Sequence, residues 1–221
     1  MGLLITSMVI AFGVVNLDQL LVGPHVRLQV QSWLSSSCLD DRALSGEAWR
    51  VATHMWIHGS LVHLVSNLVS LVGLWLLARR CFRSSEWFYI FLLSGSAAGP
   101  IQLLLQPVAG PDFTKWAPPL VSYFGQPNSP LVGASGGICG LWGALSAVAL
   151  RYWATSGRGA GQPDPGRAMV WWLTVPFLLQ VAIDSQSPGV AGAGHIAGFI
   201  CGFVIAAAPR PIRPAYLEHR P

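Results

Sequence analysis

Six long runs of apolar residues limit what this chain can fold into more than any other feature of the sequence. A helix of ~20 residues, rising 1.5 Å per residue, crosses the ~30 Å hydrocarbon core of a bilayer. Only 10% of the 221 residues are charged, whereas a soluble domain carries about 25%. The apolar segments are about 3–22, 57–78, 87–105, 131–150, 169–186 and 190–208.

These segments predict an all-α integral membrane protein, in which residues 1–210 form a multi-pass bundle of six transmembrane helices. Residues 211–221 are then a short tail. The first segment has the length of a signal peptide, but MGLLIT lacks a positively charged start, so we expect it to be retained. A single compact domain without a long cytosolic extension suits a bacterial plasma membrane, so we expect the bundle to lie in that lipid bilayer.

The basic residues predict the orientation of the segments. Nine arginines follow the second, fourth and sixth segments, whereas only four basic residues lie on the other side, in 23–56 and 106–130. Because cytoplasmic loops are enriched in arginine and lysine, both termini are expected in the cytoplasm. The net charge of +4 includes no basic run or stripe, so we expect no nucleic-acid partner.

Polar side chains interrupt three apolar segments, and such residues usually mark a site because they are costly in hydrocarbon. The second segment begins HGSLVHLVSN, which contains His63 and Asn67. The fourth contains GASGG around Ser135, and the sixth contains GHIAG around His195. His63 and Ser135 each lie 16 residues before the next arginine on the inner side, and His195 lies 15 before it. All three are therefore expected ~6–7 Å below the outer edge of the hydrocarbon.

The residue types at this depth suit covalent hydrolysis. Ser135 can attack a carbonyl carbon while His195 takes its proton as general base. His63 and Asn67 lie on one helix face and can donate hydrogen bonds to the oxyanion, together with the backbone N–H of Ser135. No spacing places the nearest acidic residue, Asp184, beside His195. A Ser–His dyad is therefore the simplest prediction.

Each of these residues has an ordinary alternative when taken alone. A serine in a transmembrane helix usually bonds a carbonyl of its own helix, and a histidine can link two helices. Glycines four residues apart predict close helix packing, which permits a serine and a histidine on different helices to come within reach of each other. These glycines are Gly133, Gly136, Gly137, Gly140, Gly194, Gly198 and Gly202.

Taken together and in order, the motifs resemble those of the rhomboid intramembrane serine proteases. GASGG is similar to the nucleophile motif, HGSLVHLVSN to the second-helix motif, and GHIAGFICG to the sixth helix. Trp49 and Arg50 resemble the Trp-Arg pair of the first outer loop. The resemblance covers all six segments, about residues 1–210.

The resemblance implies a rhomboid-like six-helix bundle with a water-filled cavity open to the outer face. It implies Ser135 as the nucleophile, His195 as the base, and His63 and Asn67 in the oxyanion hole. It implies cleavage of transmembrane protein substrates near the outer membrane boundary. We expect no cofactor and no metal, because the spacing of His54 and His58 is not accompanied by an H-E-x-x-H motif.

One position departs from the pattern. Many rhomboids carry an aromatic residue four positions after the serine, where it stacks on the catalytic histidine, and here that position is Cys139. Ring support for His195 is then missing or comes from another residue, such as Trp142. We expect this to affect the turnover rate more than the type of reaction.

Two other classes of protein remain as alternatives. A non-catalytic relative with a rhomboid-like fold would act as a membrane binding protein or chaperone, but it would be expected to lack the serine or the histidine. A small transporter would have broken helices in paired repeats and polar residues near mid-bilayer. The sequence does not predict the substrate or the oligomeric state.

Overall fold

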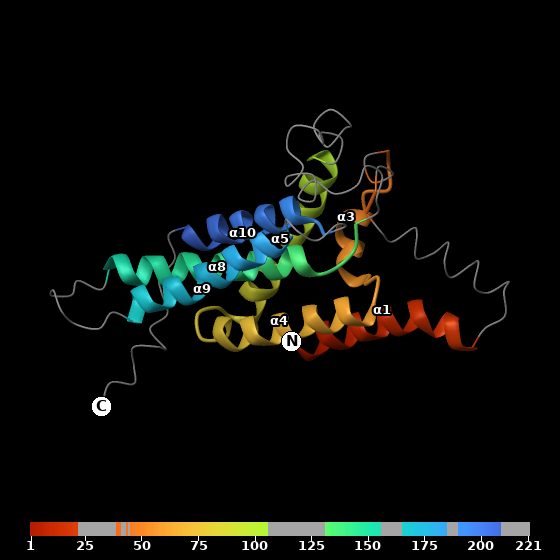
Figure 1. Cartoon of the computed structure of the whole chain (residues 1–221), viewed down its shortest axis with the longest axis horizontal. Helices are drawn as coiled ribbons and strands as arrows, with labels where there is room; N and C mark the ends of the chain where they lie inside the picture. The colour runs from red at the N-terminus through yellow and green to blue at the C-terminus, as the bar shows by residue number, and fades with distance from the viewer. Residues whose placement is uncertain are drawn as a thin grey trace.

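The computed structural model of the chain describes residues 1–21, 39–40, 43, 45–105, 131–155, 165–184 and 190–208. Within these residues the regular structure is helical, apart from one isolated antiparallel bridge between Leu39 and Leu131. The predicted tail, residues 211–221, lies outside the described residues. The elements of Figure 1 are α1 (Gly2–Leu21), α3 (Arg50–Thr53), the 3-10 helix η2 (His54–Trp56), α4 (Leu61–Ala78), α5 (Ser84–Leu105), α8 (Ser135–Thr155), α9 (Pro165–Asp184) and α10 (Gly192–Ala207).

Each predicted apolar segment overlaps one long helix, but some helices begin later than the apolar run. α4 begins at Leu61 rather than near residue 57, because Ser60 has extended backbone and serves as the N-cap. The Oγ of Ser60 accepts a hydrogen bond of 3.1 Å from the backbone N–H of His63. A serine in this position satisfies one of the N–H groups that a helix start leaves without a partner.

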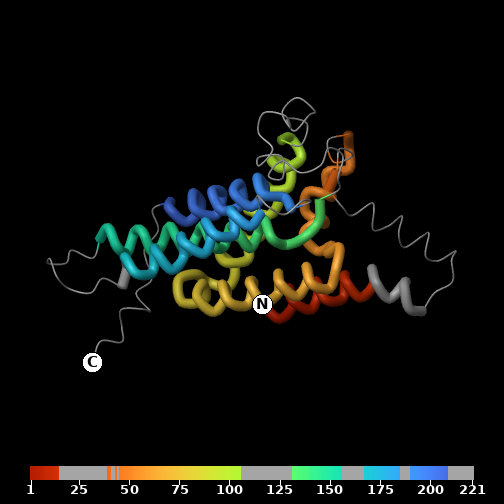
Figure 2. The backbone as a smooth tube through the Cα atoms, viewed as in Figure 1, coloured from red at the N-terminus to blue at the C-terminus, as the bar shows by residue number. Residues whose placement is uncertain are grey.

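Helix α8 is the centre of the bundle. It packs against α10, α5, α9 and α4. Figure 2 shows α8, α9 and α10 running side by side, with α5 passing steeply across them and with α1 beside α4. Helices α4, α8 and α10 begin, and α9 ends, on the same side of the bundle, at the right in Figure 1. Their terminal residues are thereby gathered at one end.

Glycines bring the backbones of α8 and α10 into contact. A Cβ on Gly202 would lie 1.8 Å from the carbonyl oxygen of Gly140, and a Cβ on Gly198 would lie 2.2 Å from that of Gly136. Real Cβ atoms essentially never approach another atom within 3.0 Å. The close approach of these two helices therefore depends on the absence of side chains at these positions.

Two further glycines of the predicted set face α5. A Cβ on Gly137 would lie 2.7 Å from the carbonyl oxygen of Phe91, and a Cβ on Gly194 would lie 3.3 Å from that of Ala98. The absence of side chains thus allows α5 to approach α8 and α10 as well.

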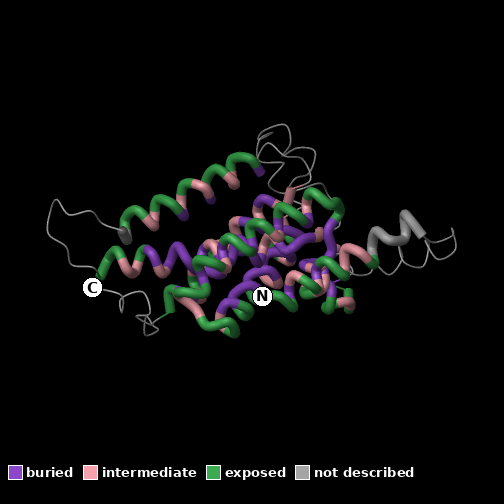
Figure 3. Tube along the Cα trace, turned by 90° about the horizontal axis from the view of Figure 1, so that it is seen from below, coloured by how far each residue is buried: buried purple, intermediate pink, exposed green. Residues whose placement is uncertain are grey.

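The outward faces of the helices are apolar. Val62 and Val69 of α4 are exposed, and so are Trp171 and Trp172 of α9. Figure 3 shows buried positions where helices face one another and exposed positions along their outer sides. A soluble monomer rarely exposes apolar surface of this extent, whereas lipid-facing helices do. Among the described helices, α4 and α5 are long and apolar enough to cross a membrane, and the apolar runs in α1 and α10 are shorter.

Candidate active site

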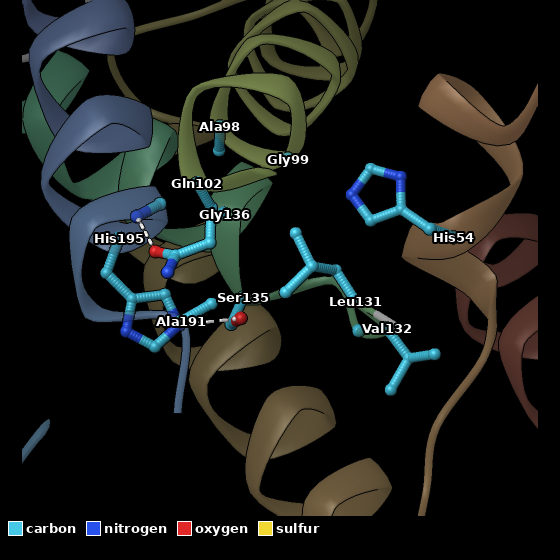
Figure 4. Close-up of a pocket in the computed structure, with 12 residues that line it drawn as sticks. His54, Ala98, Gly99, Gln102, Leu131, Val132, Ser135, Gly136, Ala191 and His195 are labelled. Carbon is cyan, nitrogen blue, oxygen red and sulfur yellow. Dashed lines mark hydrogen bonds between the residues drawn. The ribbon is translucent and has the colours of Figure 1, made fainter. Parts of the chain in front are cut away.

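Ser135 and His195 meet at the end of the bundle where α8 and α10 begin. The Oγ of Ser135 lies 2.8 Å from the Nε2 of His195, although the two residues are 60 positions apart in the chain. Ser135 is the first residue of α8 and is half-buried, and His195 lies in the first turn of α10 and is buried. Figure 4 shows the two side chains directed toward each other. This distance permits direct proton transfer from the hydroxyl to the imidazole.

The structure corrects the expectation that no acidic residue lies beside His195. Asp184 is the last residue of α9, and its Oδ2 lies 2.6 Å from the Nδ1 of His195. Because an ionised carboxylate only accepts hydrogen bonds, the proton of the imidazole lies on Nδ1. The Nε2 atom is then free to accept the hydrogen bond of the Ser135 hydroxyl.

One sequence signal could have pointed to Asp184. It is an acidic residue at the C-terminal end of an apolar helix, where the helix dipole disfavours negative charge. A carboxylate that is costly in its own helix usually has a partner elsewhere. The sequence does not reveal which residue that partner is, because this depends on how α10 lies against α9.

The predicted oxyanion donors of α4 lie against the turn that precedes Ser135. A Cβ on Gly133 would lie 2.7 Å from the Nε2 of His63 and 3.5 Å from the Nδ2 of Asn67. Gly133 lies before α8 and has φ of +112°, a conformation that side chains disfavour. Only glycine therefore allows the backbone to pass this close to both side chains.

Two N–H groups of α4 and α8 are candidate donors to a bound group. Among the described residues, the Nδ2 of Asn67 is buried and donates no hydrogen bond. As the first residue of α8, Ser135 has a backbone N–H without a partner in its own helix. A buried donor without a partner is costly, so its retention suggests that it binds a group absent from the resting protein.

The segment between residues 45 and 57 holds the backbone that leads into α8. The N–H of Gly133 donates a 2.9 Å hydrogen bond to the carbonyl of His54. His54 is itself buried, and its Nδ1 donates to the carbonyl of Arg50 at 3.0 Å. Arg50 is fully buried and forms an ion pair with Glu47. The Trp-Arg segment thus has a structural role next to the site.

A small, open cavity of about 30 Å³ lies beside the serine. Ser135 and His195 line it together with His54, Gln102 and Gly136, whereas neither His63 nor Asn67 lines it. The Oε1 of Gln102 accepts a 2.7 Å hydrogen bond from the N–H of Gly194, which ties α5 to the start of α10. Figure 4 shows the cavity between the serine–histidine pair and His54. The hydroxyl therefore lies next to an open space with the volume of about one water molecule.

Trp142 lies in the interface between α8 and α9. Its Nε1 donates a 2.8 Å hydrogen bond to the carbonyl of Leu173, and its ring contacts the edge of Phe177 with centroids 5.7 Å apart. Phe177 in turn stacks on Phe199 of α10 at 4.0 Å. These contacts join α9 to both helices of the site. The sulfur-containing side chain of Cys139 is buried in α8.

His58 precedes α4 and gives the fold a predicted sensitivity to acid. Its pKa is lowered from 6.5 to about 4, mainly by burial and also by the neighbouring His63, although the hydrogen bond to the Trp56 carbonyl opposes this shift. The unfolded chain therefore binds this proton more readily than the folded protein does. Stability is fully present above pH 6.5 and is lost as the pH falls toward about 4.

We expect the temperature of the thermal unfolding midpoint in detergent to decrease as the pH is lowered from about 7 to about 4.5. A His58→Gln variant should show a smaller decrease. Burial lowers the pKa of His54 as well, so part of the dependence should remain in the variant. Equal pH dependence in the two proteins would show that His58 does not contribute.

Comparison with known proteins gives one consistent family. The family model of the Rhomboid domain matches residues 45–211. The RHOMBOID-like protein 5 of Arabidopsis thaliana is 24% identical over 204 residues, which are 90% of this chain and 57% of that protein. The Rhomboid protease GlpG of Yersinia pestis is 26% identical over 182 residues, which are 81% of this chain and 54% of that protein.

A third relative is the Rhomboid protease GluP of Bacillus subtilis, which is 26% identical over 163 residues. The match covers 74% of this chain and 26% of that protein. The chain thus spans about half the length of its curated relatives, or less.

Proposed function

The chain belongs to the rhomboid family of integral membrane proteins, and on that premise we propose that it is an intramembrane serine endopeptidase. The observation that carries the proposal is the 2.8 Å contact between the Oγ of Ser135 and the Nε2 of His195, at the edge of a cavity. A hydroxyl bonded to an imidazole is the arrangement that nucleophilic catalysis requires.

The proposed reaction uses this pair twice. The Oγ of Ser135 attacks the carbonyl carbon of a peptide bond while the Nε2 of His195 takes the hydroxyl proton. The same proton then passes to the leaving amine as the C–N bond breaks, which leaves an acyl ester on Ser135. Water attacks the ester, with His195 again acting as general base, and the serine is restored.

The negative charge of the tetrahedral intermediate needs donors that are already in place. Among the described residues the Nδ2 of Asn67 has no partner, and the backbone N–H of Ser135 has none within its own helix, which supports this role for both. His63 lies against the same turn at Gly133 and is the third proposed donor. Removing one such donor from a serine protease lowers kcat by about 10²–10³-fold.

We assign the substrates to the class of membrane-anchored proteins, cut near the outer boundary of a plasma membrane. His63, Ser135 and His195 lie in the first turns of α4, α8 and α10. If these helices run from the outer to the inner side, as the arginines indicate, the site lies near the outer surface and is accessible to water. In this proposal the chain crosses the membrane six times, and both termini lie in the cytoplasm.

A fluorophosphonate probe tests the proposal, because it reacts with an activated serine and not with an ordinary one. We expect labelling of the detergent-purified protein at Ser135, and loss of labelling in Ser135→Ala. Ser146→Ala is the matched control: Ser146 lies on the same helix, but its hydroxyl bonds the carbonyl of Trp142 at 3.0 Å. Equal labelling of all three proteins would remove Ser135 as nucleophile. No labelling of the wild type would favour a non-catalytic rhomboid-like binding protein.

A further inference from the structure

We propose that Asp184 is a positioning residue for catalysis, so that the site works as a Ser–His–Asp triad rather than as a dyad. The inference rests on the proposed function, because it gives Asp184 a role in the same reaction. Asp184 does not line the cavity, so it acts through His195 and does not bind substrate.

The three side chains form a continuous chain of hydrogen bonds across three helices. The hydroxyl of Ser135 on α8 donates to the Nε2 of His195 on α10 at 2.8 Å. The Nδ1 of His195 donates to the Oδ2 of Asp184 on α9 at 2.6 Å. The carboxylate therefore selects the tautomer in which Nε2 can accept the serine proton, and it stabilises the imidazolium that forms.

The environment of Asp184 argues against an incidental contact. Asp184 is 1% exposed, and it lies at the C-terminal end of α9, where the helix dipole disfavours a negative charge. Burying a carboxylate costs several kcal/mol unless it is paired and hydrogen-bonded. Its two oxygens are both used, since Oδ1 accepts from the Nε2 of Gln180 at 2.7 Å while Oδ2 accepts from His195.

Gln180 fixes the direction of the carboxylate. It lies one turn before Asp184 on the same helix, and residues four apart lie on one helix face. The aromatic contacts of Phe177 with Trp142 and Phe199 hold that face of α9 against α8 and α10. The carboxylate thus has little freedom to turn away from His195.

The contact between Asp184 and His195 bears on the presence of Cys139 where many rhomboids have an aromatic residue. The sequence raised the question of what supports the imidazole where an aromatic ring is missing at this position. In the proposed triad, a hydrogen bond to Asp184 holds the ring of His195 by its Nδ1. Turnover then depends on a carboxylate from α9 in place of ring stacking from α8.

The side chains that face His195 determine which substitution tests the role of Asp184. Asp184 faces it from α9, Ser135 from α8 and His63 from α4, and Cys139 of α8 lies near the Asp184 carboxylate. Among the described residues, Asp184 is the acidic side chain in contact with this group. Its replacement should therefore alter the imidazole more than any other change that leaves Ser135 and His195 intact.

Asp184→Asn is the decisive variant. The amide can donate to Nδ1 and so favour the tautomer whose Nε2 cannot accept the serine proton. We expect kcat to fall by about 10²- to 10⁴-fold, as when a triad aspartate is replaced by asparagine in a soluble serine protease. KM should stay within about twofold, because no contact with substrate is lost. The rate of fluorophosphonate labelling should fall in parallel with kcat.

Asp184→Glu tests whether the carboxylate itself is required. It keeps an acceptor for Nδ1, and we expect it to recover activity to within about tenfold of the wild type. Gln180→Ala leaves the triad intact but frees the carboxylate, so a loss of about three- to tenfold is expected. Glu86→Gln is the control for removing one acidic residue, since Glu86 caps the backbone N–H of Arg83 at the start of α5. It should leave kcat unchanged.

Three outcomes would overturn the inference. If Asp184→Asn unfolds at a lower temperature but the folded fraction keeps its kcat, Asp184 is structural. If Asp184→Asn cannot be purified in folded form, the activities of Asp184→Glu and Gln180→Ala test the inference instead. Full activity in Gln180→Ala together with no activity in Asp184→Glu would contradict positioning through the carboxylate. Ser135→Ala separates the two hypotheses: its inactivity beside a fully active Asp184→Asn would leave a protease that works as a dyad.

Discussion

Removing the imidazole of His195 is expected to cost as much proteolytic rate as removing the hydroxyl of Ser135, and removing both is expected to cost no more. The two groups are joined by a 2.8 Å hydrogen bond and act in one proton transfer. When nucleophile and base work as a unit, the loss of either leaves the other without a function. We expect Ser135→Ala, His195→Ala and the double variant each to lower kcat by about 10⁴- to 10⁶-fold.

The measurement is the cleavage of a membrane-anchored reporter protein in liposomes, followed for the wild type and the three variants. The residual rate should be the same in all three variants, because the cavity and the proposed oxyanion donors remain. Losses that multiply in the double variant would mean that the two residues act independently. Substantial cleavage by Ser135→Ala would remove that residue as nucleophile.

Adding a single methyl group at Gly202 is expected to abolish most activity, although Gly202 lies two helical turns from His195. The new Cβ would lie 1.8 Å from the carbonyl oxygen of Gly140. Both atoms are fixed to backbone, so α8 and α10 must separate by more than an ångström to reach an ordinary contact. Overpacking of this kind costs about 1–3 kcal/mol of stability. A misplacement of ~1 Å in a catalytic pair can cost about 10²-fold in rate.

Gly73→Ala is the matched control for this variant. Gly73 lies in the interior of α4, and a Cβ there would meet nothing within 4 Å. Alanine is the better helix former by about 1 kcal/mol, so this change should be neutral or stabilising. We expect Gly202→Ala to unfold at a lower temperature and to cleave at least about 10²-fold more slowly, while Gly73→Ala retains full activity. Similar behaviour of the two variants would exclude close α8–α10 packing as the reason for glycine at 202.

Much of the site could be predicted because it lies on three helices whose geometry is regular. The rise of 1.5 Å per residue converts a spacing in sequence into a position along a helix axis. This conversion put His63, Ser135 and His195 at one level, and they lie in the first turns of α4, α8 and α10. The glycine spacings likewise predicted which faces approach closely. The number of membrane crossings stays a prediction.

The first residue of each helix was predicted less well than the segment of the chain that forms it. The predicted segments begin near residues 57 and 131, but the helices begin only at Leu61 and Ser135. The serine cap at Ser60 and the positive φ of Gly133 set these boundaries. Both effects are local and depend on backbone conformation, which apolar content does not reveal.

The sequence by itself determined which helices form, which residues lie at the same end of them, and which side chains have the chemistry for hydrolysis. Only the tertiary structure decided that Asp184 reaches the Nδ1 of His195. A helical repeat gives each residue a height and a direction on its own axis, but it carries no information about which helix lies alongside. That neighbour is chosen by packing, here by glycine contacts between α8 and α10 and by the aromatic contacts that hold α9 against them.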